Sequence, residues 1–343
     1  MLRLFGILVT VLFAIATAIL TWPGFFHLER TYPVTQIIAF RGLVVGGFAV
    51  VTGVFLLLMI AKPIRGFALS MALVSAIGAI SGGVILGVRG YGTNTLPDAT
   101  DTSVRVMTWN TAGSAMGADE IATTAAAMDA DVVSLPETSG DVGEQVALAM
   151  RDLGKPMWVF HVDLQPDVTN GPQAWQTTLL ISPDLGDYSV IEASKNLSNN
   201  SQVVPSVIAM PTDGTGPIIV AVHAVSPQRS YMDSWSSDLV WAADQCVDGN
   251  VILAGDFNAS LDHMSALGAA GNDLGYCSDS ASESGNGAVG TWPTDLPTLA
   301  GTPIDHVMHS ASWRTTGSVV LTNLDDQGSD HRPLVVQLEP TTG

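Results

Sequence analysis

Polar residues of the kinds that bind metal ions and activate water follow several short apolar segments of the sequence. The clearest case is the segment 251–254, which ends at Gly255 and is followed by Asp256 and Asn258. A short apolar run bounded by a turn residue is typical of a strand buried on both faces. In an extended D-x-N sequence the two side chains point the same way, so a carboxylate and an amide would face one point. On its own the motif is equally compatible with an ordinary turn, because Asp and Asn often occupy turns.

Other predicted strands carry comparable residues at or near their ends. These residues are Asn110, Glu137, His223, Asp305, Asp330 and His331. Each has an ordinary explanation as a turn residue, a solvated acid or, for His223, a histidine buried in the core. Together they supply carboxylates for a hard divalent cation, two neutral amides and imidazoles, which is the set that metal-assisted hydrolysis of a phosphoester requires.

Charge is divided unevenly along the 343 residues. Six of the 13 Lys and Arg residues but only one of the 32 Asp and Glu residues lie before residue 98, which gives +5 for this part and −24 for the rest. So acidic a region lacks the basic surface with which proteins hold a nucleic-acid backbone. It can still bind a phosphate locally where a divalent cation supplies positive charge.

Three apolar runs, at about residues 4–22, 43–61 and 67–88, approach the roughly 20 residues that a helix needs to cross a bilayer. A cleaved signal peptide is the alternative for the first run and buried core helices for the others. Their number, length and lack of internal charge favour a retained anchor. We therefore predict a membrane anchor (1–90), a linker rich in Gly, Pro, Thr and Asp (91–103) and a globular domain (104–343).

Lys and Arg residues near the ends of the apolar runs indicate the orientation of the anchor. The cations that fit a cytoplasmic position are Arg3, Lys62 and Arg65, and those left on the opposite side are Arg30, Arg41 and Arg89. The second group weakens the assignment without reversing it. We expect a multi-pass protein of the cell membrane with an extracytoplasmic globular domain.

The sequence contains two cysteines, Cys246 and Cys277, and both lie in the globular domain. Two buried free thiols are one interpretation. An extracytoplasmic location would also allow them to pair as a disulfide. Metal binding by these residues is disfavoured because neither belongs to a CxxC motif or lies near a cluster of histidines.

The order of predicted strands and helices indicates the fold class of the domain. Strands are expected at 104–109, 131–135, 158–162, 177–182, 203–210, 218–223, 251–254, 304–308, 313–322 and 333–338, and helices at 118–128, 141–153 and 230–245. A loop rich in Ser and Gly is expected at 278–287. Early β-α-β steps followed by strand-to-strand steps indicate an α+β fold with sheets inside and helices outside.

The motifs, in this order, resemble the endonuclease/exonuclease/phosphatase superfamily, which includes pancreatic-type deoxyribonucleases, abasic-site endonucleases, inositol polyphosphate 5-phosphatases and bacterial sphingomyelinases. The resemblance covers residues 104–338 and rests on TWN (108–110), LPE (135–137), VH (222–223), GDFN (255–258), IDH (304–306) and SDH (329–331). It implies a four-layer α/β sandwich, with two central mixed sheets flanked by helices, which here follows three transmembrane helices.

The resemblance also implies a role for each motif residue. Glu137 would ligate Mg²⁺ or Mn²⁺, with Asn110 and Asp305 also assigned to the metal. Asp256 would orient or deprotonate the attacking water. Many members have Gln before the metal-binding Glu, where this sequence has Pro136.

The remaining motif residues would act on the phosphate. By resemblance, Asn258 and His223 would hold oxygens of the scissile phosphate. His331 would contact the phosphate and stabilise developing charge, and Asp330 would orient His331 and raise its pKa.

Three functions are compatible with these features. The anchor, the short linker and the acidic domain favour a membrane-anchored phosphohydrolase acting on a lipid headgroup or on a polyprenyl- or sugar-linked phosphoester. An extracytoplasmic nuclease fits the resemblance but not the scarcity of Lys and Arg. A catalytically inactive binding or scaffold domain is disfavoured by the complete set of motif residues. The expected partners are the phosphoester substrate and the bilayer, and no protein partner is predicted.

Overall fold

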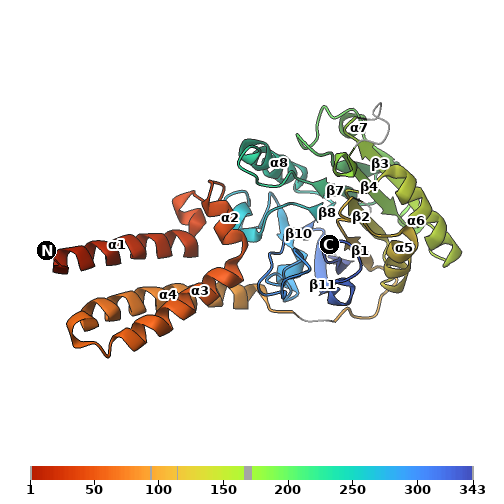
Figure 1. The fold of residues 1–343 in the computed structure, drawn as a ribbon. Helices are drawn as coiled ribbons and strands as arrows, with labels where there is room; N and C mark the ends of the chain where they lie inside the picture. Colours follow the sequence, from red (N-terminus) through yellow and green to blue (C-terminus); the bar gives the residue numbers. More distant parts are fainter. Residues whose placement is uncertain (1, 93–94, 114, 166–171, 342–343) are drawn as a thin grey trace.

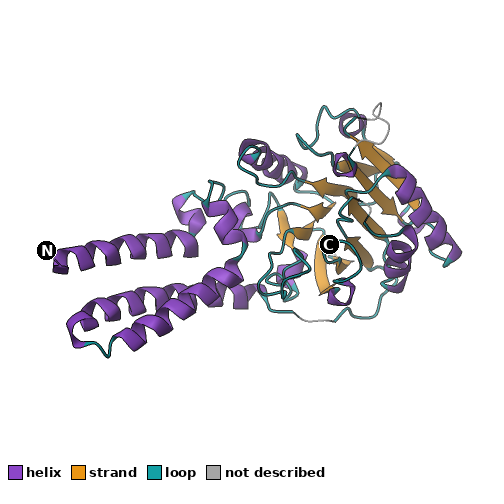
Figure 2. Cartoon of the chain, in the orientation of Figure 1, coloured by secondary structure: helices purple, strands orange, loops and turns teal. Residues whose placement is uncertain are grey.

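The computed structural model describes residues 2–92, 95–113, 115–165 and 172–341, with long helices extending from a globular part that contains two β-sheets (Figures 1 and 2). The first sheet has the strand order β11-β12-β1-β2-β4-β3 and the second has the order β5-β6-β7-β8-β10-β9. The first contains β1 (Val104–Thr108), β2 (Val132–Pro136), β3 (Trp158–Asp163), β4 (Gln176–Ile181), β11 (Trp313–Val320) and β12 (Leu334–Pro340). The second contains β5 (Tyr188–Val190), β6 (Val207–Pro211), β7 (Ile218–His223), β8 (Val251–Asp256), β9 (Cys277–Asp279) and β10 (Asp305–Ser310).

Helices cover the outer face of each sheet. The longer ones are α5 (Ala118–Ala127) and α6 (Gly140–Asp152) on the first sheet and α8 (Met232–Gln245) on the second. Short helices are α7 (Glu192–Lys195), α9 (Leu261–Met264), α10 (Ser280–Glu283), η3 (Gln173–Trp175), η4 (Pro183–Leu185) and η5 (Thr322–Leu324). Two sheets packed between helices confirm the predicted four-layer α+β sandwich.

Strand β8 shows why the apolar run 251–254 folds as it does. Ile252 and Ala254 point into the core between the sheets, whereas Val251 and Leu253 point into the core beneath α8. Both faces of the strand are therefore buried, and each large side chain contributes roughly 1.5–3 kcal/mol of burial free energy. This burial fixes the carboxyl end of β8, an inner strand, at the end of the second sheet where the site lies.

Two predicted elements differ from the structure, and a short strand was not predicted. The strand expected at 203–210 begins only at Val207, and the three-residue strand β5 carries too short a pattern to be predicted. The loop expected at 278–287 instead contains the end of β9 and helix α10. Asp279 begins this helix by accepting a hydrogen bond from the Ser282 N–H at 2.7 Å. Nearby, a disulfide joins Cys246 to Cys277, with a Cα–Cα distance of 5.6 Å.

Three N-terminal helices are long and apolar enough to cross a membrane. They are α1 (Leu2–Thr21), α3 (Arg41–Leu58) and α4 (Arg65–Arg89), and their apolar windows have mean hydropathies of 2.5, 2.0 and 2.1. The helices η1 (Pro23–Phe26) and α2 (Val34–Ala39) connect α1 to α3, and η2 (Lys62–Ile64) connects α3 to α4. The three long helices pack closely at Gly78, where a Cβ atom would collide with Thr17 and Phe48.

The described parts of the predicted linker, residues 91–92 and 95–103, are bonded to the domain at several points. The Gly92 N–H donates to the Gly285 carbonyl at 3.0 Å, and Arg105 Nη2 donates to the Pro97 carbonyl at 2.8 Å. Thr100 also donates to Glu339 at 2.7 Å. Two backbone groups and one threonine hydroxyl of the predicted linker therefore attach it to the domain.

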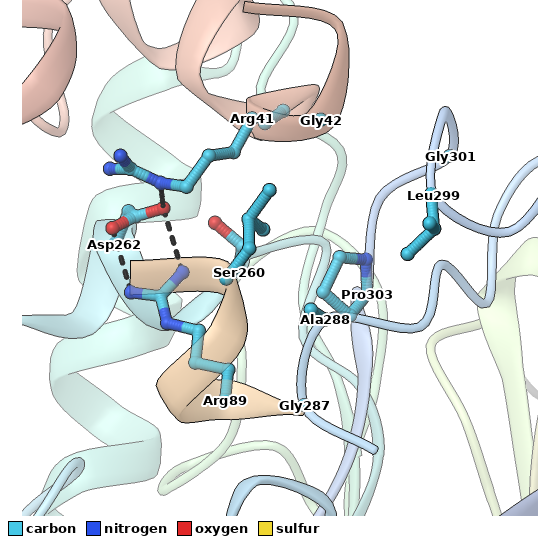
Figure 3. A pocket seen from close by; sticks show the side chains of 12 residues that line it. Arg41, Gly42, Arg89, Ser260, Asp262, Gly287, Ala288, Leu299, Gly301 and Pro303 are labelled. Carbon is cyan, nitrogen blue, oxygen red and sulfur yellow. Dashed lines mark hydrogen bonds and ion pairs between the residues drawn. The ribbon is translucent and has the colours of Figure 1, made fainter. Parts of the chain in front are cut away.

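A buried ion cluster joins the long helices to the domain (Figure 3). Asp262 of α9 pairs with Arg41 Nε at 2.6 Å and with Arg89 Nη2 at 2.7 Å. Burial would raise the pKa of Asp262, but the two guanidinium groups outweigh it and hold the pKa below its ordinary value. The start of α3 and the end of α4 are thereby tied to one carboxylate of the domain.

We expect Asp262→Asn to destabilise the full chain by about 3–5 kcal/mol, because two buried guanidinium groups lose their counter-charge. Chemical unfolding of the detergent-solubilised protein, followed by tryptophan fluorescence, measures this change. Asp152→Asn is the matched control, because the Asp152 side chain is 73% exposed in its pair with Arg151. Equal unfolding free energies for the two variants would show that the cluster does not hold the helices to the domain.

Candidate active site

The position of β8 between two neighbouring strands assembles the centre of the site. Asp256 lies opposite His223 of the parallel strand β7 and opposite Asp305 of the antiparallel strand β10. Gly255 permits the close approach of β7, since a Cβ atom there would collide with the Val222 carbonyl oxygen. The strand register therefore puts one imidazole and two carboxylates in a row at the sheet edge.

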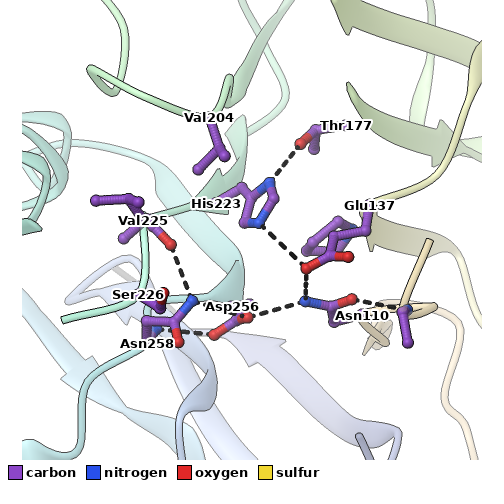
Figure 4. A network of polar contacts seen from close by, with 12 residues as sticks. Asn110, Glu137, Thr177, Val204, His223, Val225, Ser226, Asp256 and Asn258 are labelled. Atoms are coloured by element: carbon purple, nitrogen blue, oxygen red, sulfur yellow. Dashed lines mark hydrogen bonds and ion pairs between the residues drawn. The ribbon is translucent and has the colours of Figure 1, made fainter. Parts of the chain in front are cut away.

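Asn110, just after β1, connects the two sheets within the site (Figure 4). Its Nδ2 donates to Glu137 Oε1 at 3.2 Å and to Asp256 Oδ2 at 2.9 Å. The Ala112 N–H donates to Asn110 Oδ1 at 2.9 Å, which leaves the amide nitrogen facing the carboxylates. Asn110 thus holds two carboxylates together, instead of presenting its oxygen as the metal ligand that we predicted.

Backbone turns, and not an extended chain, aim two of the predicted side chains. Glu137 and Asn258 have positive φ angles of 57° and 48°. The Asn258 N–H donates to Asp256 Oδ1 at 2.8 Å, and its Nδ2 donates to Asp256 Oδ2 at 3.2 Å and to the Ala224 carbonyl at 2.9 Å. Asn258 therefore faces Asp256, as the D-x-N pattern predicted, but through a tight turn. Both of its amide hydrogens are used, so in this geometry it orients Asp256 and has none left for a phosphate oxygen.

His331 is oriented by Asp305. Its Nδ1 donates to Asp305 Oδ2 at 2.9 Å, and its Nε2 lies 3.9 Å from Asp256 Oδ2. This corrects the predicted orienting role of Asp330, which is exposed and instead accepts a hydrogen bond from Trp292 Nε1 at 2.8 Å. The charge of Asp330 still helps to raise the pKa of His331, as predicted, but less than that of Asp305. Adjacent side chains in the loop point in different directions, so Asp330 and His331 do not meet.

The charge of His331 follows from its surroundings. Burial would lower its pKa, but the nearby charges of Asp305 and Asp256 and the hydrogen bond to Asp305 outweigh burial and raise the pKa to about 10. His331 is therefore an imidazolium at neutral pH and presents Nε2–H beside Asp256.

His223 has the opposite character. Burial, assisted by the charge of His331, lowers its pKa to about 3. The Thr177 hydroxyl donates to the Pro205 carbonyl at 2.6 Å, so His223 Nδ1 is the donor in its 3.3 Å contact with Thr177. The neutral ring thus directs the lone pair of Nε2 toward Glu137 Oε1, 4.0 Å away.

Two carboxylates at the centre of the site, Asp256 and Asp305, share one positively charged neighbour, His331. Burial and the charge of Asp305 raise the pKa of Asp256 to about 7, although His331 and Asn110 lower it. Ligand atoms of Asp256, Asp305 and His331 lie within 4.8 Å of one another. Among the described residues, Asp305 Oδ1 is a buried oxygen without a hydrogen-bond partner. The carboxylate oxygens of Asp256 and Asp305, with the Glu137 carboxylate, are the hard donors that fit a divalent cation. Asn110 joins Glu137 to Asp256, whereas the protonated ring of His331 offers the cation no lone pair.

A cavity of about 610 Å³ opens onto these residues, with Glu137, Asp256 and His331 in its lining. The lining residues that were not predicted to be functional include Tyr32, Phe40, Arg229 and Trp292. Tyr32 and Phe40 precede α3 and carry no sequence signal for a site. Trp292 belongs to the TWP turn, where the sequence shows only that an aromatic residue follows Thr291.

A sequence model described as the Endonuclease/Exonuclease/phosphatase family matches residues 107–331. The fold is similar to that of an endonuclease/exonuclease/phosphatase from Beutenbergia cavernae DSM 12333, with 17% identity over 70% of this chain and 72% of that chain and a TM-score of 0.53. It is also similar to humanized D. rerio TDP2 carrying 14 mutations (16% identity, 69% and 99% covered, TM-score 0.51). A family protein from Leptotrichia buccalis C-1013-b gives 13% identity, 69% and 99% coverage and a TM-score of 0.51. No curated protein matches the chain significantly.

We expect Asp305→Asn to lower the pKa of His331 by more than about one unit, because the neutral amide removes the carboxylate that stabilises the imidazolium. Imidazole NMR resonances of the metal-free protein, followed against pH, measure the shift. Asp330→Asn is the matched control and should have a smaller effect, since Asp330 bonds to Trp292 instead. The pairing is wrong if Asp330→Asn produces the larger shift.

Proposed function

Because the chain belongs to the endonuclease/exonuclease/phosphatase family, whose members hydrolyse phosphoester bonds, we propose that it is a membrane-anchored, divalent-metal-dependent phosphoester hydrolase. One observation carries the proposal: Glu137 follows β2, Asp256 ends β8 and His331 precedes β12, yet all three line a single cavity. Their carboxylates and imidazolium are the groups needed to hold a cation, direct water and bind a phosphoryl oxygen.

Glu137 and Asp256 are the residues that we assign to a bound Mg²⁺ or Mn²⁺. Asn110 holds their carboxylates near each other by donating to both. Glu137 is 27% exposed at its side chain, so it reaches the cavity while Asp256 stays buried. The bound cation would offset the negative charge of the phosphoryl group and polarise it.

Asp256 and His331 are assigned to the chemical step. Asp256 accepts hydrogen bonds from Asn110 and Asn258, which fix its carboxylate so that it can orient the attacking water. His331 keeps its proton through the contact with Asp305 and can donate Nε2–H to a phosphoryl oxygen as negative charge develops.

His223 is assigned to the opposite side of the reacting group. Its Nδ1–H is used by Thr177, so the neutral ring can accept a hydrogen bond at Nε2 from water or from a protonated substrate oxygen. It can donate to a phosphate oxygen, as the resemblance implied, only after taking up a proton.

The distribution of cations supports an extracytoplasmic domain. Arg41 and Arg89, which weakened this assignment from the sequence, are neutralised by Asp262 inside the structure. Arg30 also has a counter-charge, Glu29, at 3.6 Å.

The start of α1 and the turn between α3 and α4 lie at the ends of the helices far from the domain (Figure 1). Arg3 belongs to the start of α1, and Lys62 belongs to that turn. The cations without a carboxylate partner then favour a cytoplasmic position for that end under the positive-inside rule.

The purified full chain, supplied with Mg²⁺ or Mn²⁺, should be tested on bis-p-nitrophenyl phosphate, plasmid DNA and phospholipid vesicles. The proposal requires hydrolysis that chelation with EDTA abolishes. Faster cleavage of DNA than of the other substrates would establish the nuclease alternative. Metal binding without hydrolysis of any substrate would establish a scaffold domain and refute the proposal.

Replacing Asp256 by Asn should lower kcat about 100- to 10,000-fold, because the amide keeps the size of the side chain but cannot accept a proton from water. The assay is EDTA-sensitive hydrolysis of bis-p-nitrophenyl phosphate. Asp187→Asn, at an exposed position outside the cavity lining, serves as the control. A near-normal rate for Asp256→Asn would remove the proposed role of this carboxylate.

Two variants that each add one cysteine to the native disulfide pair should reveal the side of the membrane on which the domain lies. If the domain is extracytoplasmic, a membrane-impermeant maleimide labels Ser189→Cys in intact cells, whereas Lys62→Cys reacts only after lysis. Ser189 is exposed on β5 and Lys62 begins η2. The reverse pattern would place the domain in the cytoplasm.

A further inference from the structure

The segment between the first two long helices, residues 22–40, is fastened to the globular domain beside the candidate active site. Gln36 Nε2 donates to the Pro227 carbonyl at 2.6 Å, in the loop after β7. His263 Nε2 donates to the Thr35 carbonyl at 3.0 Å, and Arg30 Nη1 donates to the His263 carbonyl at 3.3 Å. These bonds attach the segment to α9 and to the loop after β7, so its position relative to the site is fixed.

The same segment forms one wall of the cavity. Tyr32, Gln36, Ala39 and Phe40 line the same cavity as Asp256 and His331. The Phe40 ring packs against Trp292 with a centroid separation of 5.9 Å, and the Arg229 guanidinium lies 5.5 Å from the Tyr32 ring centroid. The part of the cavity lining that residues 32–40 contribute is therefore largely aromatic and apolar.

Phe40 also marks the level of the site relative to the proposed bilayer. It directly precedes Arg41, the first residue of α3, and η1 begins two residues after the end of α1. Trp22 and Phe25 in the same segment are 45% and 80% exposed. Aromatic residues at the ends of membrane-spanning helices typically lie at the lipid–water interface. If α1 and α3 cross the membrane, the cavity lies at its surface.

The charges around the cavity favour a single phosphate over a polyanion. Of the described residues that line it, Arg229 is the one Arg or Lys, and Glu137, Asp256 and Asp330 are acidic. A nucleic-acid strand needs a series of cations along its backbone. One phosphoester flanked by hydrocarbon matches a site with one arginine, a divalent-cation position and an aromatic wall.

We propose that this site takes a phosphoester carried by a membrane lipid, and that residues 32–40 contact the hydrocarbon next to the phosphoester. Tyr32 and Phe40 are then specificity-determining residues contributed by the anchor. The inference rests on the proposed function for the reaction itself. It adds that the anchor helps to select the substrate as well as to hold the domain at the membrane.

The probe is a series of alkyl phosphates offered to the full chain in phosphatidylcholine vesicles with Mg²⁺. Inorganic phosphate, ethyl phosphate and octyl phosphate are titrated calorimetrically, with protein-free vesicles as the reference for partition into lipid. Octyl phosphate should bind at least about tenfold more tightly than ethyl phosphate, because each methylene that is fully buried is worth roughly fourfold in affinity. Equal affinities would overturn the inference, as would tighter binding of a short oligonucleotide.

Two substitutions of Phe40 separate the subsite from general effects of the membrane. Phe40→Ala should lose most of the gain from ethyl to octyl phosphate, whereas Phe40→Leu should keep most of it because leucine also buries hydrocarbon. Trp158→Ala removes an aromatic side chain that is 52% exposed and outside the cavity lining, and should keep the full gain. Retention of the gain in a folded Phe40→Ala variant, checked by its unfolding midpoint, would contradict the proposal.

These binding measurements do not depend on turnover. Absence of EDTA-sensitive hydrolysis of all three substrates, bis-p-nitrophenyl phosphate, plasmid DNA and phospholipid vesicles, would refute the proposed function. A missing dependence on chain length, with hydrolysis of any of them intact, would refute only the lipid inference.

Discussion

Two buried carboxylates, Asp256 at the end of β8 and Asp262 in α9, have different charged partners. This difference supports a catalytic role for one of them and a structural role for the other. Asp262 is paired with two guanidinium groups, which keep its pKa below the ordinary value. Asp256 has no Arg or Lys partner among the described residues, and burial together with Asp305 raises its pKa to about 7. Asp262 therefore has its charge balanced and joins the N-terminal helices α3 and α4 to the domain. Asp256 has a raised pKa beside a cavity, where a bound cation would stabilise its charged form. Such perturbed pKa values are common among catalytic groups.

The sequence predicted the fold well where burial is strongly patterned. Runs such as 251–254 become strands because both faces are covered, and the spacing of Trp235, Leu239 and Ala242 places one face of α8 on the second sheet. Short elements such as β9 were missed because three residues carry too little pattern, and their pairing depends on a distant strand. The part that residues 22–40 play in lining the cavity was missed for a similar reason, since the hydrogen bonds of this segment join residues about 190 or more positions apart.

The sequence predicted which residues belong to the candidate site better than it predicted the hydrogen bonds between them. Strand ends indicated which residues could meet, and the structure brings Glu137, Asp256 and His331 to one cavity. Sequence could not show that His331 bonds to Asp305 and not to its neighbour Asp330. Nor could it show that Asn110 donates to two carboxylates, because that depends on a bridge between the two sheets.

The most direct measurement of the central claim is binding of Mn²⁺ to the full chain, followed by the electron paramagnetic resonance of the free ion. If Glu137 and Asp256 hold a divalent cation, the wild type removes Mn²⁺ from solution and Glu137→Gln weakens this binding at least about tenfold. Glu144→Gln, at an exposed position on α6, should bind like the wild type. Equal binding by wild type and Glu137→Gln would contradict the assignment of a metal to this cavity.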